Sequence, residues 1–236
     1  IARQFVLLDN TYTSGTNSAD GHQWISASMA NAYVEQNYSA HARSYPYDGG
    51  DALSAPPKGY LWNAAKKAGV TLRVYGEFVD KPSIKDPDTG KTPSWTQCWQ
   101  DYRSGANRIV IRSDTSTLAL KPYLHPNFIG FPSIVSDQWR ADTYIADLKR
   151  FEKSGKMPRL QMILLPNNHT SGTSPTMPTP RAMVADNDLA TGRIIEAITR
   201  SKFWKETLIL VIEDDSQFGV DHVDGHRTTA FCVSPY

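Results

Sequence analysis

The run Thr207-Leu-Ile-Leu-Val-Ile212 passes directly into Glu213-Asp-Asp-Ser216, and this junction decides the predicted fold. A short apolar run that is rich in branched residues and bounded by polar ones is typical of a buried parallel strand. Three more runs share this pattern and predict core strands: residues 4–8, 161–165 and 229–233. Two weaker strand candidates are residues 70–75 and 108–111.

Helical patterns separate these runs. Apolar side chains recur at helical spacing in four segments: residues 20–36, 60–68, 143–154 and 179–199. The last is the clearest, because Pro180 suits the first turn of a helix and Met183, Leu189 and Ile194 can share a face. The alternation of strands and helices predicts an α/β fold, with a mostly parallel central sheet covered by helices on both faces.

Residues 81–135 differ from the rest of the chain. Pro, Asp, Ser and Thr dominate there, hydrophobic periodicity is poor, and residues 81–90 have the composition of a turn-rich surface loop. We expect a loop-rich elaboration near the substrate entrance, within a single domain over residues 1–236. The chain starts without Met and ends directly after a strand-like run, so we also expect sequence to be missing at both ends.

The composition excludes two classes of partner. Lys and Arg total 25 against 24 for Asp and Glu, which leaves no global basic surface for specific nucleic-acid binding. No apolar run approaches the roughly 18 residues of a membrane-spanning helix. Cys98 and Cys232 permit one disulfide, but the apolar surroundings of Cys232 favour a buried free thiol. His125 has no acidic neighbour at ligand spacing and is predicted to be a surface or structural residue.

The segment from Glu213 to His226 carries five carboxylates and two imidazoles in fourteen residues. Asp214 and Asp215 stand at the strand exit, and Asp221, His222 and His226 follow. Such a density of like charge is costly to fold unless a cation neutralises it. The alternative is a solvated acidic loop, which does not explain two histidines at i, i+4 beside four aspartates. The pattern favours a divalent-metal site.

Two more polar segments follow predicted strands. In Ser18-Ala-Asp-Gly-His22, Ser18 stands at a predicted helix N-terminus, where backbone N–H groups favour a phosphate anion and a nearby cation would make the hydroxyl nucleophilic. The alternative is a simple N-cap. In Pro166-Asn-Asn-His-Thr170, Asn168 and His169 are candidate ligands, and the alternative is a polar loop that caps the next helix. All three polar segments follow strand ends, so we expect them at one rim of the sheet.

The motifs resemble those of the bacterial phosphoesterase family, which includes phospholipase C and certain acid phosphatases and belongs to the alkaline phosphatase superfamily. The likeness covers roughly residues 2–24 and 160–236, and it is greatest to a subgroup that often also carries a β-propeller. The motifs that carry it are Leu7-Leu-Asp-Asn10, Ser18-Ala-Asp-Gly-His-Gln-Trp24, Leu165-Pro-Asn-Asn-His-Thr-Ser-Gly-Thr173, Thr179-Pro-Arg-Ala-Met-Val-Ala-Asp-Asn-Asp188 and the segment from Val211 to Arg227.

The resemblance implies an alkaline-phosphatase-like α/β fold and metal-assisted hydrolysis of phosphate esters, with export to the periplasm or beyond. Ser18 matches the superfamily nucleophile, with His22 four residues later. Asp214 and Asp215 match a metal-binding pair, and three histidines match residues near the metal and phosphate: His169, His222 and His226. The donors suit Zn, Mn or Fe, or Ca if carbonyl groups contribute, and Ser18 is expected to contact the cation.

Two departures from the family pattern motivate rival hypotheses. Asn168 stands where the family usually has Asp, and no Glu-Asn strand end precedes Ile1. One rival is a non-catalytic binding module on the same fold with a degraded metal site. Another is a sulfate-ester hydrolase of the same superfamily. The leading hypothesis is a metal-dependent phosphoesterase that acts through a phosphoseryl intermediate on Ser18, with His169 or His222 as the proton donor to the leaving group.

Overall fold

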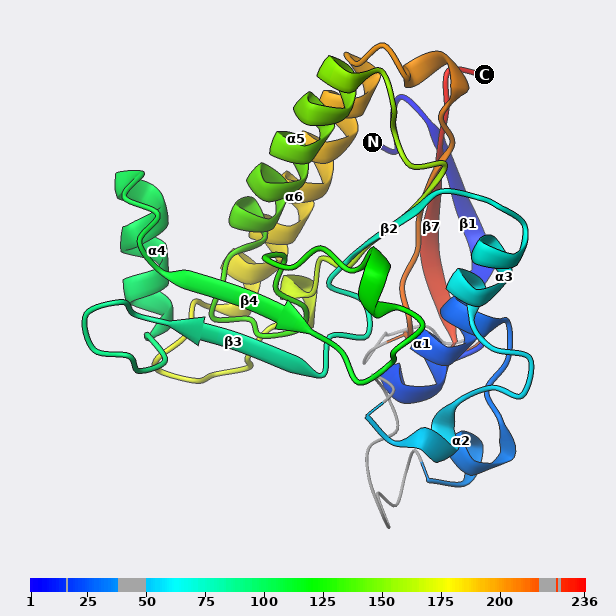
Figure 1. Cartoon of the computed structure of the whole chain (residues 1–236), viewed down its shortest axis with the longest axis horizontal. Helices are drawn as coiled ribbons and strands as arrows, with labels where there is room; N and C mark the ends of the chain where they lie inside the picture. The colour runs from blue at the N-terminus through cyan, green and yellow to red at the C-terminus, as the bar shows by residue number, and fades with distance from the viewer. Residues whose placement is uncertain (16, 38–49, 217–223, 225) are drawn as a thin grey trace. The chain divides into compact units, whose positions relative to one another are not determined.

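The computed structural model describes residues 1–15, 17–37, 50–216, 224 and 226–236. These residues form two compact units: unit 1 comprises Ile1–Val70 with Trp204–Tyr236, and unit 2 comprises Thr71–Phe203. Both units combine helices with strands (Figure 1), and unit 2 contains a parallel strand pair, so the predicted α/β class is confirmed. Within the described ranges, none of the helices is both long and apolar enough to cross a bilayer.

Unit 1 is built on a three-stranded sheet. The strands β1 (Val6–Tyr12), β7 (Arg227–Val233) and β6 (Ile209–Val211) lie in the order β1-β7-β6, and Figure 1 shows β1 beside β7. Both strand pairs are antiparallel. The pairing of β1 with β7 is irregular between Leu8 and Thr11. The helical segments of the unit are α1 (Ser18–Ala27), α2 (Ala32–Asn37), α3 (Leu61–Lys67), η1 (Ala52–Ser54) and η4 (Trp204–Glu206).

Two local expectations for unit 1 are wrong. The predicted strands at residues 4–8, 207–212 and 229–233 exist, but they pair antiparallel, and β1 is mostly exposed. The helix predicted for residues 20–36 is broken in two. Ser28 adopts a left-handed conformation, with φ of 57°, and ends α1. The Asn31 side chain then accepts the Val34 N–H, so this short polar side chain begins a new helix instead of continuing the old one.

Unit 2 combines a parallel strand pair with two long helices. The strands β2 (Leu72–Tyr75) and β5 (Leu160–Ile163) pair parallel, as expected for strands joined by a helical crossover. The helices α5 (Asp137–Ser154) and α6 (Pro180–Thr199) lie side by side (Figure 1). Ser136 and Thr179 cap their N-termini by accepting backbone N–H groups.

The segment 81–135 is more regular than its sequence indicates. It contains β3 (Lys81–Lys85), β4 (Val110–Asp114), α4 (Trp95–Ser104) and η2 (Lys121–Tyr123). The turn-rich loop predicted for residues 81–90 therefore begins with a strand. Only Ile84 of β3 is buried, so no alternating pattern marks the strand, and Pro82 disguises it further. The strand pairs antiparallel with β4 and packs over a small core: Ile84, Cys98, Ile111, Ile129 and Val135.

The cysteines of both units are free. Cys98 is buried, and burial raises the pKa of its thiol to about 11, so the thiol stays protonated at neutral pH. The prediction of a free thiol at Cys232 is confirmed, although Cys232 is only partly buried.

His125 is buried in unit 2, where its N–H donates to Val74 of β2 and its side chain has an acidic partner that is distant in sequence. Its Nε2 lies 3.4 Å from Asp147 Oδ2, and its Nδ1 accepts the Asn127 N–H at 3.2 Å. The Tyr75 hydroxyl donates to the same Asp147 oxygen at 2.9 Å. This geometry requires a neutral imidazole, with the proton on Nε2. Burial, followed by the charges of Arg73 and Arg150, lowers the pKa of His125 to about 4.

The free energy of unfolding is expected to fall as the pH drops from 6.5 to 4. Because burial lowers the pKa of His125 from 6.5 to about 4, the unfolded chain binds the proton more readily in this window. The contribution of neutral His125 is complete above pH 6.5, and the loss amounts to up to about 3 kcal/mol at pH 4. Urea denaturation of the wild type and of His125→Gln at several pH values measures the contribution of His125 to the free energy of unfolding. An equal loss in both proteins across the window would show that His125 does not titrate as described.

Candidate active site

Helix α1 of unit 1 begins without using the Ser18 hydroxyl as a cap. The N-cap is Asn17, whose side chain accepts the Ala19 N–H at 3.0 Å. Asp20 completes the capping box by accepting the Asn17 N–H at 2.9 Å. The alternative that Ser18 is merely the N-cap is therefore wrong. Its hydroxyl is left for a contact outside the helix.

That contact is with the acidic pair after β6. Ser18 Oγ donates to Asp215 Oδ2 at 2.9 Å. One helical turn later, His22 Nε2 lies 3.2 Å from Asp214 Oδ2. Residues four apart share one face of a helix, so α1 presents Ser18 and His22 together to the two carboxylates. Four of the predicted site residues thus lie together in unit 1.

Asp214 is ionised at neutral pH. Burial acts to raise the pKa of its carboxyl, but the hydrogen bond and the charge of His22 lower that pKa to about 2. Asp215 is 8% exposed and accepts the hydrogen bond from the Ser18 hydroxyl. The site thus holds a low-pKa carboxylate beside an imidazole, and a second carboxylate that orients a hydroxyl.

Two glycines allow this close approach. A Cβ added to Gly21 would lie 2.1 Å from the Asp214 carbonyl oxygen, and one added to Gly15 would lie 2.5 Å from the same atom. Gly15 also forms an isolated parallel bridge with Asp215. Only a residue without a side chain fits at either position, so the glycines set how near α1 comes to the acidic pair. The sequence signal for this packing is Gly21, because a glycine inside a helical pattern often has a packing reason.

The histidines of the C-terminal motif are less fully described. His226 precedes β7, and its Nδ1 lies 3.1 Å from Asp224 Oδ1, which also accepts the His226 N–H. That backbone hydrogen bond is the main cause of the lowered pKa of Asp224. His222 and Asp221 lie outside the described residues. In the ranges that the structure describes, no three His, Cys, Asp or Glu side chains are grouped to hold a metal ion.

The described donors nevertheless fit part of a metal site. Asp214 and Asp215 supply two carboxylates at one strand exit, and Ser18 Oγ lies 2.9 Å from an Asp215 oxygen. Carboxylate and hydroxyl oxygens are hard donors of the kind that divalent cations bind. The ionised state of Asp214 is the state in which a carboxylate serves as a ligand. These three side chains are therefore the ones that would hold a cation.

His169 belongs to unit 2, in the short helix η3 (Asn167–His169) that also contains Asn168. Its side chain is exposed, and its ring packs edge-on against Phe131 at 5.0 Å. Its Nδ1 lies 3.2 Å from the Thr170 carbonyl oxygen. Among the described residues, none forms a hydrogen bond with the other ring nitrogen, and the role of His169 stays a prediction from the sequence.

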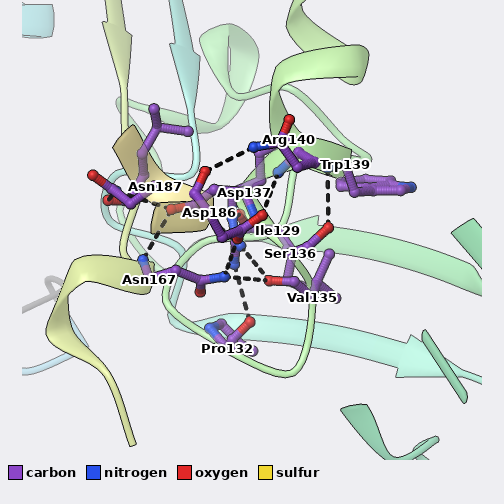
Figure 2. Close-up of polar contacts among 12 residues, drawn as sticks. Ile129, Pro132, Val135, Ser136, Asp137, Trp139, Arg140, Asn167, Asp186 and Asn187 are labelled. Carbon is purple, nitrogen blue, oxygen red and sulfur yellow. Dashed lines mark hydrogen bonds and ion pairs between the residues drawn. The ribbon is translucent and has the colours of Figure 1, made fainter. Parts of the chain in front are cut away.

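A buried polar network holds η3 in place (Figure 2). The Asn167 N–H donates to Asp137 Oδ2 at 3.0 Å, and the Asn167 side chain donates to Asp186 Oδ2 at 2.8 Å. Asn187 bridges Asp137 and the Leu165 carbonyl, at 2.9 and 2.7 Å. The motif residues Asp186 and Asn187 are therefore structural, a role that the sequence analysis did not assign. They fix the loop that carries Asn168 and His169.

Arg140 closes the network (Figure 2). It is completely buried, pairs with Asp137 at 3.0 Å and donates to four carbonyl groups: Ile129, Gly130, Pro132 and Val135. Burial raises the pKa of Asp137, while the Arg140 charge opposes that rise. A buried charge is tolerated only when its partners are this complete.

Gly21→Ala is expected to lower the free energy of unfolding by about 2 kcal/mol, because the new methyl group collides with the Asp214 carbonyl. Gly192→Ala in α6 is the matched control, since a Cβ there meets nothing within 4 Å. That control should gain about 0.5–1 kcal/mol from the higher helix propensity of Ala. Chemical denaturation of both variants measures the difference. If the two variants are equally stable, the close contact at Gly21 is absent.

No family model matches the chain, and no curated protein matches it. Among solved structures, the fold is similar to that of a protein in the alkaline phosphatase superfamily from Vibrio parahaemolyticus, with a TM-score of 0.54. The two sequences are 15% identical, and the match covers 98% of this chain and 52% of the other. This chain thus spans about half the length of that protein. The chain therefore shares the α/β fold of an alkaline phosphatase superfamily protein, and a likeness at this identity shows the fold alone.

Proposed function

We propose that the chain is a hydrolase of phosphate esters that uses Ser18 as its nucleophile and a divalent cation at Asp214 and Asp215. The observation that carries the proposal is the 2.9 Å hydrogen bond from Ser18 Oγ to Asp215. A hydroxyl at a helix N-terminus usually caps the helix, but here Asn17 and Asp20 do so. The Ser18 hydroxyl instead faces a carboxylate. The sequence motifs and the fold agree with the proposal.

The residues of the chain supply most of the reaction. Asp215 orients the Ser18 hydroxyl and accepts its proton as Oγ attacks phosphorus. The Oγ–P bond forms while the bond from phosphorus to the leaving oxygen breaks, and the leaving group takes a proton. The positive end of the α1 dipole favours the phosphate charge. Water then hydrolyses the phosphoserine and releases phosphate.

A bound cation would stabilise charge on the phosphoryl oxygens and favour the Ser18 alkoxide. Asp214, Asp215 and Ser18 are its proposed ligands, and His22 keeps Asp214 ionised and oriented. The donor set suits Zn, Mn, Fe or Ca. His222 and His226 are further proposed ligands, and His169 the proposed proton donor. For these three histidines the sequence resemblance is the support, as it is for export to the periplasm or beyond.

Ser18→Ala is expected to lower kcat for an aryl phosphate ester by roughly 10³-fold or more, because it removes the attacking atom. Ser14→Ala removes an exposed serine that precedes the helix and should keep the wild-type rate. The assay measures aryl phosphate monoesters and diesters, and an aryl sulfate, with each candidate metal added.

Each result of this assay selects one hypothesis. An unchanged rate in Ser18→Ala would contradict the nucleophile assignment. Faster hydrolysis of the sulfate than of either phosphate would favour the sulfatase alternative. If elemental analysis finds no bound metal and no ester is hydrolysed, the chain is a non-catalytic binding module, the alternative that Asn168 motivates.

A further inference from the structure

We propose that Thr13 is a positioning residue of the candidate active site: its hydroxyl fixes the Asp214 carbonyl group and thereby aims the Asp214 and Asp215 carboxylates. The catalytic consequence rests on the proposed function. The positioning itself is a property of the chain without substrate or metal, and it can be measured separately.

The hydroxyl of Thr13 joins two segments that are about two hundred residues apart in sequence. Thr13 Oγ1 donates to the Asp214 carbonyl oxygen at 2.7 Å. Thr13 Oγ1 also accepts the Gly15 N–H at 3.0 Å. A hydroxyl has one proton and two lone pairs, so donation to Asp214 leaves an acceptor for Gly15, and both bonds form together.

The Asp214 carbonyl sets the orientation of the peptide group between the two aspartates. On one side of that peptide the Asp214 side chain meets His22, and on the other the Asp215 side chain meets Ser18. A rotation of the peptide would move both carboxylates away from α1. The hydrogen bond from Thr13 opposes this rotation, while the glycines at positions 15 and 21 provide the space for the carbonyl.

The main chain of Thr13 orders a third segment. Its N–H donates to the His226 carbonyl oxygen at 2.9 Å, immediately before β7. Thr13 thus holds two parts of the acidic motif in place. Its side chain binds Asp214, after β6, and its main chain binds His226, before β7. Substitution at this position should therefore disturb the geometry of the site more than it disturbs the core of unit 1.

The test compares three variants. Thr13→Val keeps the size and the branched shape but removes the hydroxyl, whereas Thr13→Ser keeps the hydroxyl. Thr11→Val is the matched control, because Thr11 lies two residues earlier, in β1, and its hydroxyl donates to the nearby Leu8 carbonyl oxygen at 3.0 Å. The first readout is NMR of metal-free protein labelled with ¹³C-carboxyl aspartate, with resonances assigned from Asp214→Asn and Asp215→Asn. Calorimetric titration with Mn²⁺ and steady-state hydrolysis follow.

Thr13→Val is expected to shift both carboxyl resonances toward those of unfolded peptides. It should also weaken Mn²⁺ binding and lower kcat, each by roughly 10–100-fold, with KM nearly constant. Thr13→Ser should restore all three readouts to within about threefold, and Thr11→Val should resemble the wild type. Wild-type carboxyl resonances in a folded Thr13→Val protein would overturn the inference. Equal effects of Thr13→Val and Thr13→Ser would overturn it too, because the hydroxyl would then be irrelevant.

A failure of the proposed function is distinguishable from a failure of this inference. If the wild type hydrolyses no ester, or binds no Mn²⁺, the carboxyl resonances still decide the role of Thr13. If Thr13→Val does not fold, the wild-type protein decides. Its Thr13 hydroxyl proton, slowed in exchange by the bond to the Asp214 carbonyl, should give a resolved resonance with a cross-peak to the Gly15 amide. A rapidly exchanging hydroxyl would contradict the inference.

Discussion

The close packing of the Asp214 main chain against Gly15 and Gly21 is the constraint on which the candidate active site depends. A single added methyl group at Gly21 would lie 2.1 Å from the Asp214 carbonyl oxygen. This approach brings the strand exit after β6 within hydrogen-bonding distance of one face of α1. Ser18 then reaches Asp215 and His22 reaches Asp214 without any long or flexible side chain. A site held by short side chains and main-chain contacts is preorganised, which lowers the cost of orienting reacting groups.

In unit 2, the loop that carries Asn168 and His169 is held by a different means. There the loop after β5 is held by a network of buried amide, carboxylate and guanidinium groups around Asp137 and Arg140. Each buried charge has several partners, so the network offsets the cost of removing those charges from water. The orientation of such bonds is specific, and it fixes η3 more tightly than apolar packing alone would. The motif residues Asp186 and Asn187 therefore hold this loop in place through hydrogen bonds.

The sequence predicts where the candidate site residues stand in the fold better than it predicts the residues that hold them in place. Ser18 and Asp214 were expected at helix and strand ends because hydrophobic periodicity locates those ends. Hydrophobic periodicity does not reveal which residue caps the helix. Asn17 is the N-cap of α1 because of its local hydrogen bonds. The strand Lys81–Lys85 buries one side chain only, so it shows no alternating pattern. Whether strands pair parallel or antiparallel depends on their connections, which no local pattern shows. Thr13 lacks a signal because the Asp214 and His226 carbonyl groups, to which it donates, are about two hundred residues away in sequence.

Anomalous diffraction from crystals soaked in Mn²⁺ tests most directly whether the strand exit and α1 form one cation site. The geometry predicts a peak within roughly 2.0–2.3 Å of an oxygen of Asp215, with an Asp214 oxygen and Ser18 Oγ completing the same site. Bound phosphate should then lie at the N-terminus of α1. A cation bound elsewhere, with Ser18 and His22 still paired to the two carboxylates at full Mn²⁺ occupancy, would contradict the assignment of this site.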